Sequence, residues 1–267
     1  MKNTRYIFIG PLVILLVWFA FTASGFVNPL FLPKLDVTIS KFISLFAQGI
    51  ILPDIAMTLY RVFFGFLLAT LLGVPLGLLF GLSARLYASF ELVIEFFRSI
   101  PSTALFPLFL LVFGIGDVAK IAVVVFVSFW IILSSTASGV LHSLKTRHKV
   151  AQSFGANQWQ ILTNVTFMEA LPQIATGLRV AVSISFIVVV VTEMFIGTNI
   201  GLGQRIYDSY LTYRVPELYA TLIIIGLLGY FVNKGLILLE RKTIHWTGRY
   251  GTETITEPET IAQIITP

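Results

Sequence analysis

The sequence predicts an all-α integral membrane protein with about six transmembrane helices. Hydrophobic residues make up 57 % of the 267 residues and charged residues only 12 %, whereas about 25 % of the residues in a soluble domain are charged. The mean hydropathy is +0.90. Because a bilayer offers no water to backbone polar groups, and because the apolar runs are continuous rather than alternating, we expect helices and not barrel strands.

Six apolar stretches approach the roughly 20 residues that a membrane-spanning helix needs. They cover residues 7–25, 54–82, 102–116, 118–141, 171–197 and 217–239, and the third can be extended back to about residue 90. The first stretch resembles a signal peptide, but its length and the odd number of spans that cleavage would leave favour a retained helix.

The segment between the first two spans is amphipathic. Apolar side chains recur near helical spacing within residues 35–49, at Val37, Phe42, Leu45 and Phe46. An apolar face beside polar residues is typical of a helix in the membrane interface. We expect this helix to lie at the outer surface without crossing.

The distribution of Lys and Arg predicts the orientation. With a cytoplasmic N-terminus, ten basic residues lie in inner segments and five in outer loops, which places both termini in the cytoplasm. The net charge of +5 then indicates contact with anionic lipid rather than with nucleic acid. The ten inner residues are Lys2, Arg5, Arg85, Arg98, Lys145, Arg147, Lys149, Arg241, Lys242 and Arg249.

The chain divides into three parts. Residues 1–53 hold the first span and the interfacial helix, and residues 54–246 hold a core of five spans. Residues 247–267 are rich in Thr and Glu and lack an apolar face, so we expect a disordered cytoplasmic tail.

Charged residues also occur within the predicted spans. A carboxylate at the middle of a bilayer costs about 2.5–3.5 kcal/mol on insertion scales, so Glu193 in the fifth span should face protein or water. Arg61 in the second span lies at a similar depth, which favours an ion pair over the two alternatives, a gate or a contact with solute. Arg179 is expected to extend toward headgroup phosphates or toward a loop of its own subunit.

Small residues line several of these spans. The second span carries Gly65, Gly73, Gly77 and Gly81 at four- or eight-residue spacing, which indicates a close-packing face. The fourth and fifth spans carry serines that favour hydrogen bonds between helices, although they could also line a hydrated path. The serines selected as candidates for the path are Ser128, Ser135 and Ser185.

No motif for catalysis or metal binding occurs. The absence of cysteine excludes disulfides and thiolate metal sites. The three histidines do not form H-E-x-x-H, and neither G-x-S-x-G nor the nucleotide-binding G-x-x-x-x-G-K-[ST] is present. We therefore expect no catalytic residues, no metal and no cofactor bound by this chain.

Residues 142–170 form the longest predicted cytoplasmic connection. Apolar and amide side chains alternate within residues 149–162, which predicts a short helix, a turn at Gly155 and a second helix. This segment has too little apolar area to bury itself. It either lies on the headgroup layer or docks on a partner protein.

Four stretches give the chain a family resemblance: RSIPSTALFPLFLLVFGIGD, AQSFGANQWQIL, ALPQIATGLRVAVSISF and TEMFIGTNIGLG. They resemble the permease subunits of binding-protein-dependent ABC importers, in the nitrate/sulfonate/taurine/bicarbonate branch. The family signature E-A-A-x-x-x-G-x9-I-x-L-P aligns on Gly155, where Lys149 replaces its Glu and Met168 its Pro. The resemblance covers residues 58–246.

This resemblance implies a MetI-like ABC importer permease fold in a bacterial inner membrane. Two copies of the permease would form the path, two ATPase subunits would bind ATP and Mg, and an external solute-binding protein would deliver a small anionic, sulfonate- or taurine-like solute. Nitrate or bicarbonate is the alternative solute, and a secondary transporter is the alternative class. The coupling helix near 149–162 would contact the ATPase through Lys149, Ala151, Gln152, Phe154, Gly155, Ala156 and Trp159.

Overall fold

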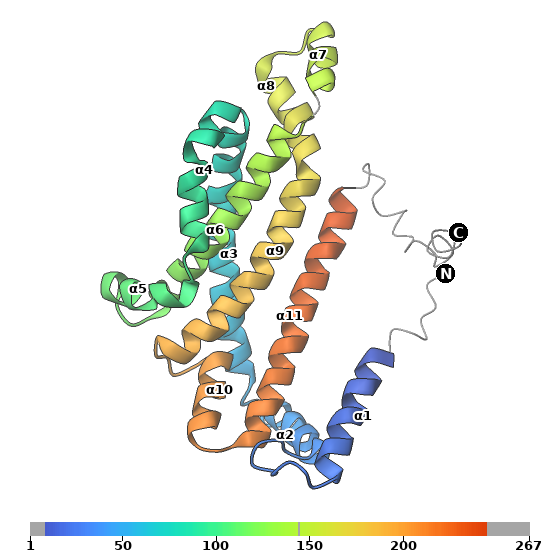
Figure 1. Cartoon of the computed structure of the whole chain (residues 1–267), viewed down its shortest axis with the longest axis vertical. Helices are drawn as coiled ribbons and strands as arrows, with labels where there is room; N and C mark the ends of the chain where they lie inside the picture. Colours follow the sequence, from blue (N-terminus) through green and yellow to red (C-terminus); the bar gives the residue numbers. More distant parts are fainter. Residues whose placement is uncertain (1–8, 144, 245–267) are drawn as a thin grey trace, which may run out of the picture.

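The structure is a computed structural model that describes residues 9–143 and 145–244, and the regular elements of these residues are all helices. The long helices run side by side along the vertical axis of Figure 1. Short helices α2 (Leu35–Ala47) and α10 (Leu202–Leu211) lie at one end, and α7 (Lys145–Ser153) and α8 (Gln158–Ile161) lie at the other. The predicted tail at 247–267, together with Lys2, Arg5 and Arg249, lies outside the described residues.

Four helices of the described residues are long and apolar enough to cross a membrane. Three of them confirm predicted spans, and the fourth begins earlier than predicted, because α8 continues through a π-helical turn at Leu162–Thr166 into α9. The four are α3 (Leu52–Gly81), α6 (Asp117–Leu141), the continuous helix Gln158–Phe195 that includes α9 (Phe167–Phe195), and α11 (Val215–Thr243).

The predicted third span at 102–116 is wrong as a straight helix. The chain there forms α4 (Ala84–Ser99), a 3-10 turn at Ser102–Leu105 and α5 (Phe106–Phe113), bent by 86°. Proline explains the break, because Pro101 has no N–H to donate and restricts the residue before it, and Ile100 is extended. The bent pair counts as a fifth candidate span.

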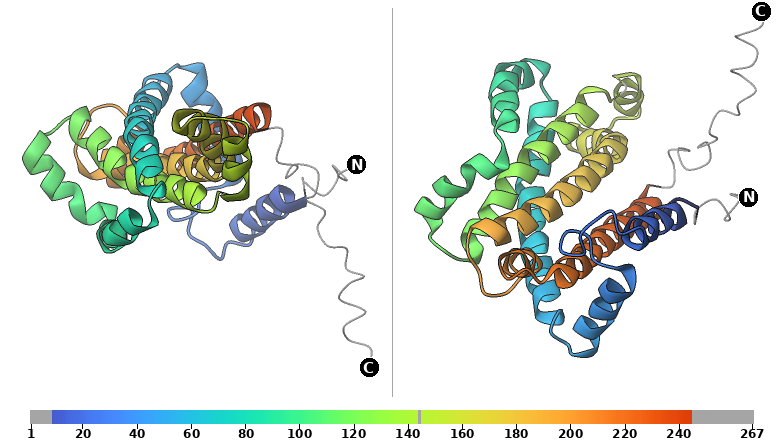
Figure 2. Two further views of the ribbon diagram at one scale, coloured as in Figure 1. Left: turned by 90° about the horizontal axis from the view of Figure 1, so that it is seen from above. Right: turned by 60° about the horizontal axis from the view of Figure 1, so that its bottom comes forward.

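The N-terminal helices lie at the edge of the bundle. The predicted first span at 7–25 corresponds to the apolar helix α1 (Ile9–Ala23), whose 15 described residues are fewer than a spanning helix needs. The indole nitrogen of Trp18 donates to the Pro33 carbonyl oxygen at 3.0 Å, and the Trp18 ring lies 5.4 Å from that of Tyr219 in α11. Figure 2 shows α1 on one side of the bundle and α5 projecting on the opposite side.

The predicted helix at 35–49 is confirmed as α2, at the same end of the molecule as α10. Its Leu45 is buried in a cluster with Ile51, Leu202, Ala220 and Ile224, whereas Ile39 and Ile43 are exposed on its other side. The amphipathic pattern thus fixes which face packs on α11 and α10. The interfacial position of α2 stays a prediction.

The glycine face of α3 packs directly on α6, as predicted. A Cβ at Gly65 would lie 2.5 Å from a Val124 methyl carbon, and one at Gly77 would lie 2.6 Å from Thr136 Cβ and 2.7 Å from the Leu133 carbonyl oxygen. Close approach of backbones lets van der Waals contact hold helices together where lipid competes for apolar surface. The α3–α6 contact therefore depends on the missing side chains.

We predict that Gly77→Ala destabilises the protein by about 1–3 kcal/mol, the usual effect of overpacking. The added Cβ meets backbone, so α3 and α6 must separate. Thermal unfolding in detergent measures the loss. The control is Gly226→Ala in α11, where an added Cβ has no atom within 4 Å and the better helix propensity should leave stability equal or higher. Equal stability of both variants would contradict the prediction.

Candidate functional site

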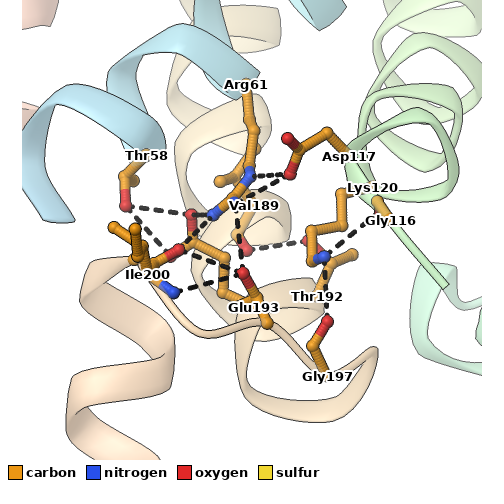
Figure 3. Close-up of polar contacts among 12 residues, drawn as sticks. Thr58, Arg61, Gly116, Asp117, Lys120, Val189, Thr192, Glu193, Gly197 and Ile200 are labelled. Carbon is orange, nitrogen blue, oxygen red and sulfur yellow. Dashed lines mark hydrogen bonds and ion pairs between the residues drawn. The ribbon is translucent and has the colours of Figure 1, made fainter. Parts of the chain in front are cut away.

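A buried ion pair joins α3 to α9 near the α2–α10 end of the bundle. The Nη1 of Arg61 lies 2.5 Å from Oε1 of Glu193, and both side chains are almost fully buried. Figure 3 shows the two side chains pointing toward each other between their helices. The predicted pairing of Arg61 with Glu193 is therefore confirmed.

Two further charges from α6 complete this cluster, and the sequence analysis did not single them out. Asp117, the first residue of α6, accepts from Nε of Arg61 at 2.8 Å and pairs with Nη2 at 2.7 Å. The buried Lys120, one turn later, donates to the carbonyl oxygens of Gly116 at 3.2 Å and Gly197 at 3.1 Å. Their signal was a Lys and an Asp at the start of an otherwise apolar helix. We call Arg61, Asp117, Lys120 and Glu193 the charge cluster.

The charge cluster also holds the loop between α9 and α10. Arg61 donates to the Ile200 carbonyl oxygen at 3.0 Å and to the Thr198 hydroxyl at 3.2 Å. Gly201, with a φ of 152°, packs so closely that a Cβ would lie 2.6 Å from Cδ of Glu193. A side chain here would collide with the ion pair, so the glycine is needed for this approach.

The first turn of α10 donates its free N–H groups to side chains of α3 and α9. Gly201 N–H donates to Asp54 at 2.9 Å, Leu202 N–H to the Thr58 hydroxyl at 3.0 Å and Gly203 N–H to Oε2 of Glu193 at 2.9 Å. A helix N-terminus has unsatisfied donors and favours negative charge. The two carboxylates thus fix where α10 begins.

A second ionic network lies beside the charge cluster and includes α2 and α11. Arg205 of α10 bonds Asp54 at 2.5 Å and Glu217 at 2.8 Å. Burial alone would lower the pKa of Arg205, but the bonds to Asp54 and Glu217 raise it above its ordinary value. Glu217 also pairs with Lys41 at 3.3 Å and Arg214 at 3.2 Å. Four helices are therefore joined at this end.

A polar pocket opens next to the charge cluster. Its volume is about 640 Å³, and Asp117 and Lys120 line it together with Asn199, Gln204 and Tyr207. Lys120 is turned inward onto two carbonyl oxygens. In this conformation, the pocket therefore presents amide, carboxylate and phenol groups beside the apolar Ile115, Met194 and Phe195. Among the described residues, no group of His, Cys, Asp and Glu could hold a metal ion.

The predicted path serines lie between packed helices. The hydroxyls of Ser128 and Ser185 are fully buried and lie 2.8 Å apart, joining α6 to α9. Ser135 lies where Gly177 of α9 approaches, and a Cβ on that glycine would be 2.4 Å from Ser135 Cβ. In this conformation, the three serines serve helix packing. Arg179 likewise pairs with Glu240 of α11, at 3.1 Å, instead of extending to headgroups.

The opposite end carries the predicted helix, turn and second helix. Gly155 has a φ of +80°, the left-handed region that favours glycine, and a Cβ there would have no atom within 4 Å. Glycine is therefore needed here for its backbone conformation. The space around it within the chain would accept a side chain. The second helix begins with a capping box. The Asn157 side chain accepts from Gln160 N–H at 2.8 Å, and the Gln160 side chain accepts from Asn157 N–H at 2.9 Å.

Apolar side chains of this turn project away from the molecule. Phe154 is 87 % exposed and Trp159 is 70 % exposed, and Val150 is exposed as well. The turn itself is anchored, because Arg147 pairs with Glu169 at the start of α9 at 2.7 Å. We call Val150, Phe154 and Trp159 the exposed turn face. The other predicted coupling residues, Lys149, Ala151, Gln152 and Ala156, lie on the same turn and are exposed or half-buried.

Comparison with known proteins gives consistent matches. A family model described as "Binding-protein-dependent transport system inner membrane component" matches residues 73–241. A putative ABC transporter permease of Methanocaldococcus jannaschii is 34 % identical over 82 % of this chain and 84 % of its own length. The taurine transport system permease of Escherichia coli is 30 % identical over 90 % of this chain and 89 % of its own length. A bicarbonate transport system permease of Synechococcus elongatus is 30 % identical over 87 % of this chain and 86 % of its own length.

Among solved structures, a chain of the inward-facing MetNI methionine ABC transporter matches with a TM-score of 0.60 at 24 % identity. The match covers 72 % of this chain and 93 % of that chain, and at this identity it shows the fold.

Apolar helices that bury a charge cluster, together with a polar turn at one end, define a multi-pass membrane transport subunit rather than an enzyme. The chain belongs to the binding-protein-dependent ABC importer permeases of the inner membrane, in the branch that includes taurine, sulfonate and bicarbonate permeases.

The charge cluster yields a prediction for a mutant cycle. Arg61→Met should destabilise the protein by about 3–5 kcal/mol, because it leaves the buried Glu193 carboxylate without its cation. Glu193→Gln should cost less, since Asp117 still neutralises Arg61 and the amide oxygen can still accept from Thr58. The double variant should be more stable than Arg61→Met alone. Denaturant unfolding in detergent gives the three values.

The control is Asp117→Asn, whose side chain is 40 % exposed, and we expect only a small loss. Strictly additive effects of Arg61→Met and Glu193→Gln would show that the two side chains do not interact.

Proposed function

We propose that this chain is the membrane-spanning subunit of an ATP-driven importer for a small anionic solute and that it couples to a separate ATPase through the turn between α7 and α8. The exposed turn face is the observation that carries this proposal. Its side chains project from the polar turn and from the first residues of the helix that follows it, yet the turn is held in one shape by a capping box and an ion pair. A rigid turn with exposed aromatic side chains suits a groove on another protein.

The orientation follows from the same proposal. The α7–α8 end faces the cytoplasm, where ATP is available, and the α2–α10 end faces the external solute-binding protein. The loop arginine and lysines at 145–149 favour this orientation. Arg98 no longer supports it, because it is the penultimate residue of α4 and lies away from the α7–α8 end.

A second copy of the permease completes the path in this proposal. Exposed apolar side chains cover most of the surface of α5, and α5 projects from the side of the single chain. In a membrane, such a surface would be covered by a partner copy or by lipid. Two ATPase subunits beneath two permeases, carrying ATP and Mg, match the importer arrangement that the family resemblance implies.

The solute is proposed only as a class. Relatives for taurine and for bicarbonate are equally similar to this chain, at 30 % identity. A sulfonate- or taurine-like solute is our first choice and nitrate or bicarbonate the second. Binding of each solute to the cognate external protein distinguishes them, because that protein selects the solute in this scheme.

We predict that the double variant Phe154→Ala/Trp159→Ala folds normally but loses most of its ATPase partner during copurification. Both side chains are exposed, so their removal leaves no cavity. Interface aromatics of this kind contribute about 2 kcal/mol or more each when they anchor binding. The matched control is Phe231→Ala on α11, which is 61 % exposed away from this turn. Copurification at the unaltered level would reject the docking role and leave a headgroup-lying turn.

The purified chain is also predicted to lack ATP hydrolysis until its partner ATPase is added. In sealed vesicles, solute uptake should then require ATP and the external binding protein. Uptake driven by an ion gradient without ATP would instead support a secondary transporter.

A further inference from the structure

The helix α4 carries a charged flank that the proposed function does not explain. Glu91, Glu95 and Arg98 are spaced four and three residues apart, which places them on one side of the helix. All three residues are exposed. The side chain of Glu95 is 58 % exposed and that of Arg98 is 43 % exposed. The two latter residues form an ion pair at 2.6 Å. We call these three residues the α4 flank.

Aromatic contacts fix the depth of the α4 flank. Near the middle of α4, the ring of Phe90 stacks on Phe80, close to the end of α3, at 5.0 Å. Near its end, Phe97 stacks on Trp130 at 4.9 Å with an angle of 10° between the rings. Trp130 lies about halfway along the spanning helix α6. Arg98, next to Phe97, therefore lies near the middle of the membrane.

Lipid is a poor environment for such a flank. A charged side chain at the centre of a bilayer costs about 2.5–3.5 kcal/mol on insertion scales, and pairing relieves only part of this. Glu91, beside Phe90, lies nearer the end of α3 and so nearer the membrane surface, and the cost falls on Glu95 and Arg98. The α4 flank should therefore face water or protein in the assembled transporter.

The backbone after α4 leads to the same conclusion independently. The helix stops at Ser99, Ile100 is extended and a 3-10 turn follows Pro101, all at this mid-membrane depth. Pro101, Thr103 and Ala104 are exposed. Irregular backbone at membrane depth is tolerated only where protein buries it or where it lines a water-filled cavity. The broken helix and the charges occupy the same region of the chain.

We propose that the α4 flank and the bend after it line the water-filled path of the importer, with Arg98 as the group that meets the anionic part of the solute at mid-depth. A planar guanidinium suits sulfonate or carboxylate oxygens, and the solute would compete with Glu95 for it. This inference rests on the proposed importer function and replaces the buried serines as the candidate path lining.

The absence of cysteine in the chain allows a direct test by single Cys substitution. Glu91→Cys, Glu95→Cys and Arg98→Cys are made in the full chain, and membrane vesicles are treated with a charged, membrane-impermeant methanethiosulfonate reagent. The control is Phe96→Cys, one residue from Glu95, with the native side chain 61 % exposed on a different side of the helix. Because only the thiolate reacts, we expect labelling of the flank to be at least about tenfold faster than at position 96.

Transport measurements add a second readout. Arg98→Gln should raise the KM for solute uptake by about tenfold, equivalent to a loss of about 1.4 kcal/mol, and Arg98→Lys should recover part of it. ATP-driven uptake with no labelling of the flank would overturn the inference and leave the importer function intact. Equal labelling at Phe96→Cys would also overturn it. Loss of ATP dependence would reject the importer function itself, whatever the labelling.

Discussion

The bond between Arg61 and Glu193 is the interaction on which the α2–α10 end of the molecule depends. Neither charge could stay within a membrane-embedded bundle alone, so each needs the other, and the remaining lone pairs and donors need partners as well. Asp117, the first turn of α10 and the carbonyl oxygen of Ile200 supply them. The same requirement explains the glycines at the start of α10, Gly201 just before it and Gly203 in its first turn, since a Cβ at either position would collide with Glu193.

Away from this cluster, the bundle is held by close contact of small residues. On α3, the face that meets α6 is built from glycines, which admit Val124, Ile132, Thr136 and Val140 of α6, and Gly177 of α9 admits Ser135 in the same way. Large apolar residues are buried between these helices and also cover the exposed sides. Their exposure follows from the solvent, because lipid gives apolar side chains no reason to turn inward.

The sequence predicted those features that depend on local pattern and on the cost of burying charge. Apolar runs located four spans, glycine spacing located the close-packing face of α3, and a lone acid in an apolar run led to its basic partner. It did not predict features set by tertiary packing. The bend after Ser99 was missed because the apolar run continues through Pro101, although proline itself was the available signal. Lys120 and Asp117 were missed because sequence distance hides their approach to Arg61. The ion pair of Arg179 was missed because its partner Glu240 lies on another helix.

The unbroken course of the chain from α8 into α9 has a mechanical consequence. The helix Gln158–Phe195 carries Trp159 near one end and Glu193 near the other, and its 38 residues extend over about 57 Å at 1.5 Å per residue. Gly177, where the helix crosses α6 in tight contact, lies close to its midpoint. The π-helical turn at Leu162–Thr166 and Pro172 separate Trp159 from this crossing, and helices bend most readily at such points. A force on the turn would therefore flex the helix there, while its far half, which carries the ion pair, stays bonded to α6 through Ser128 and Ser185.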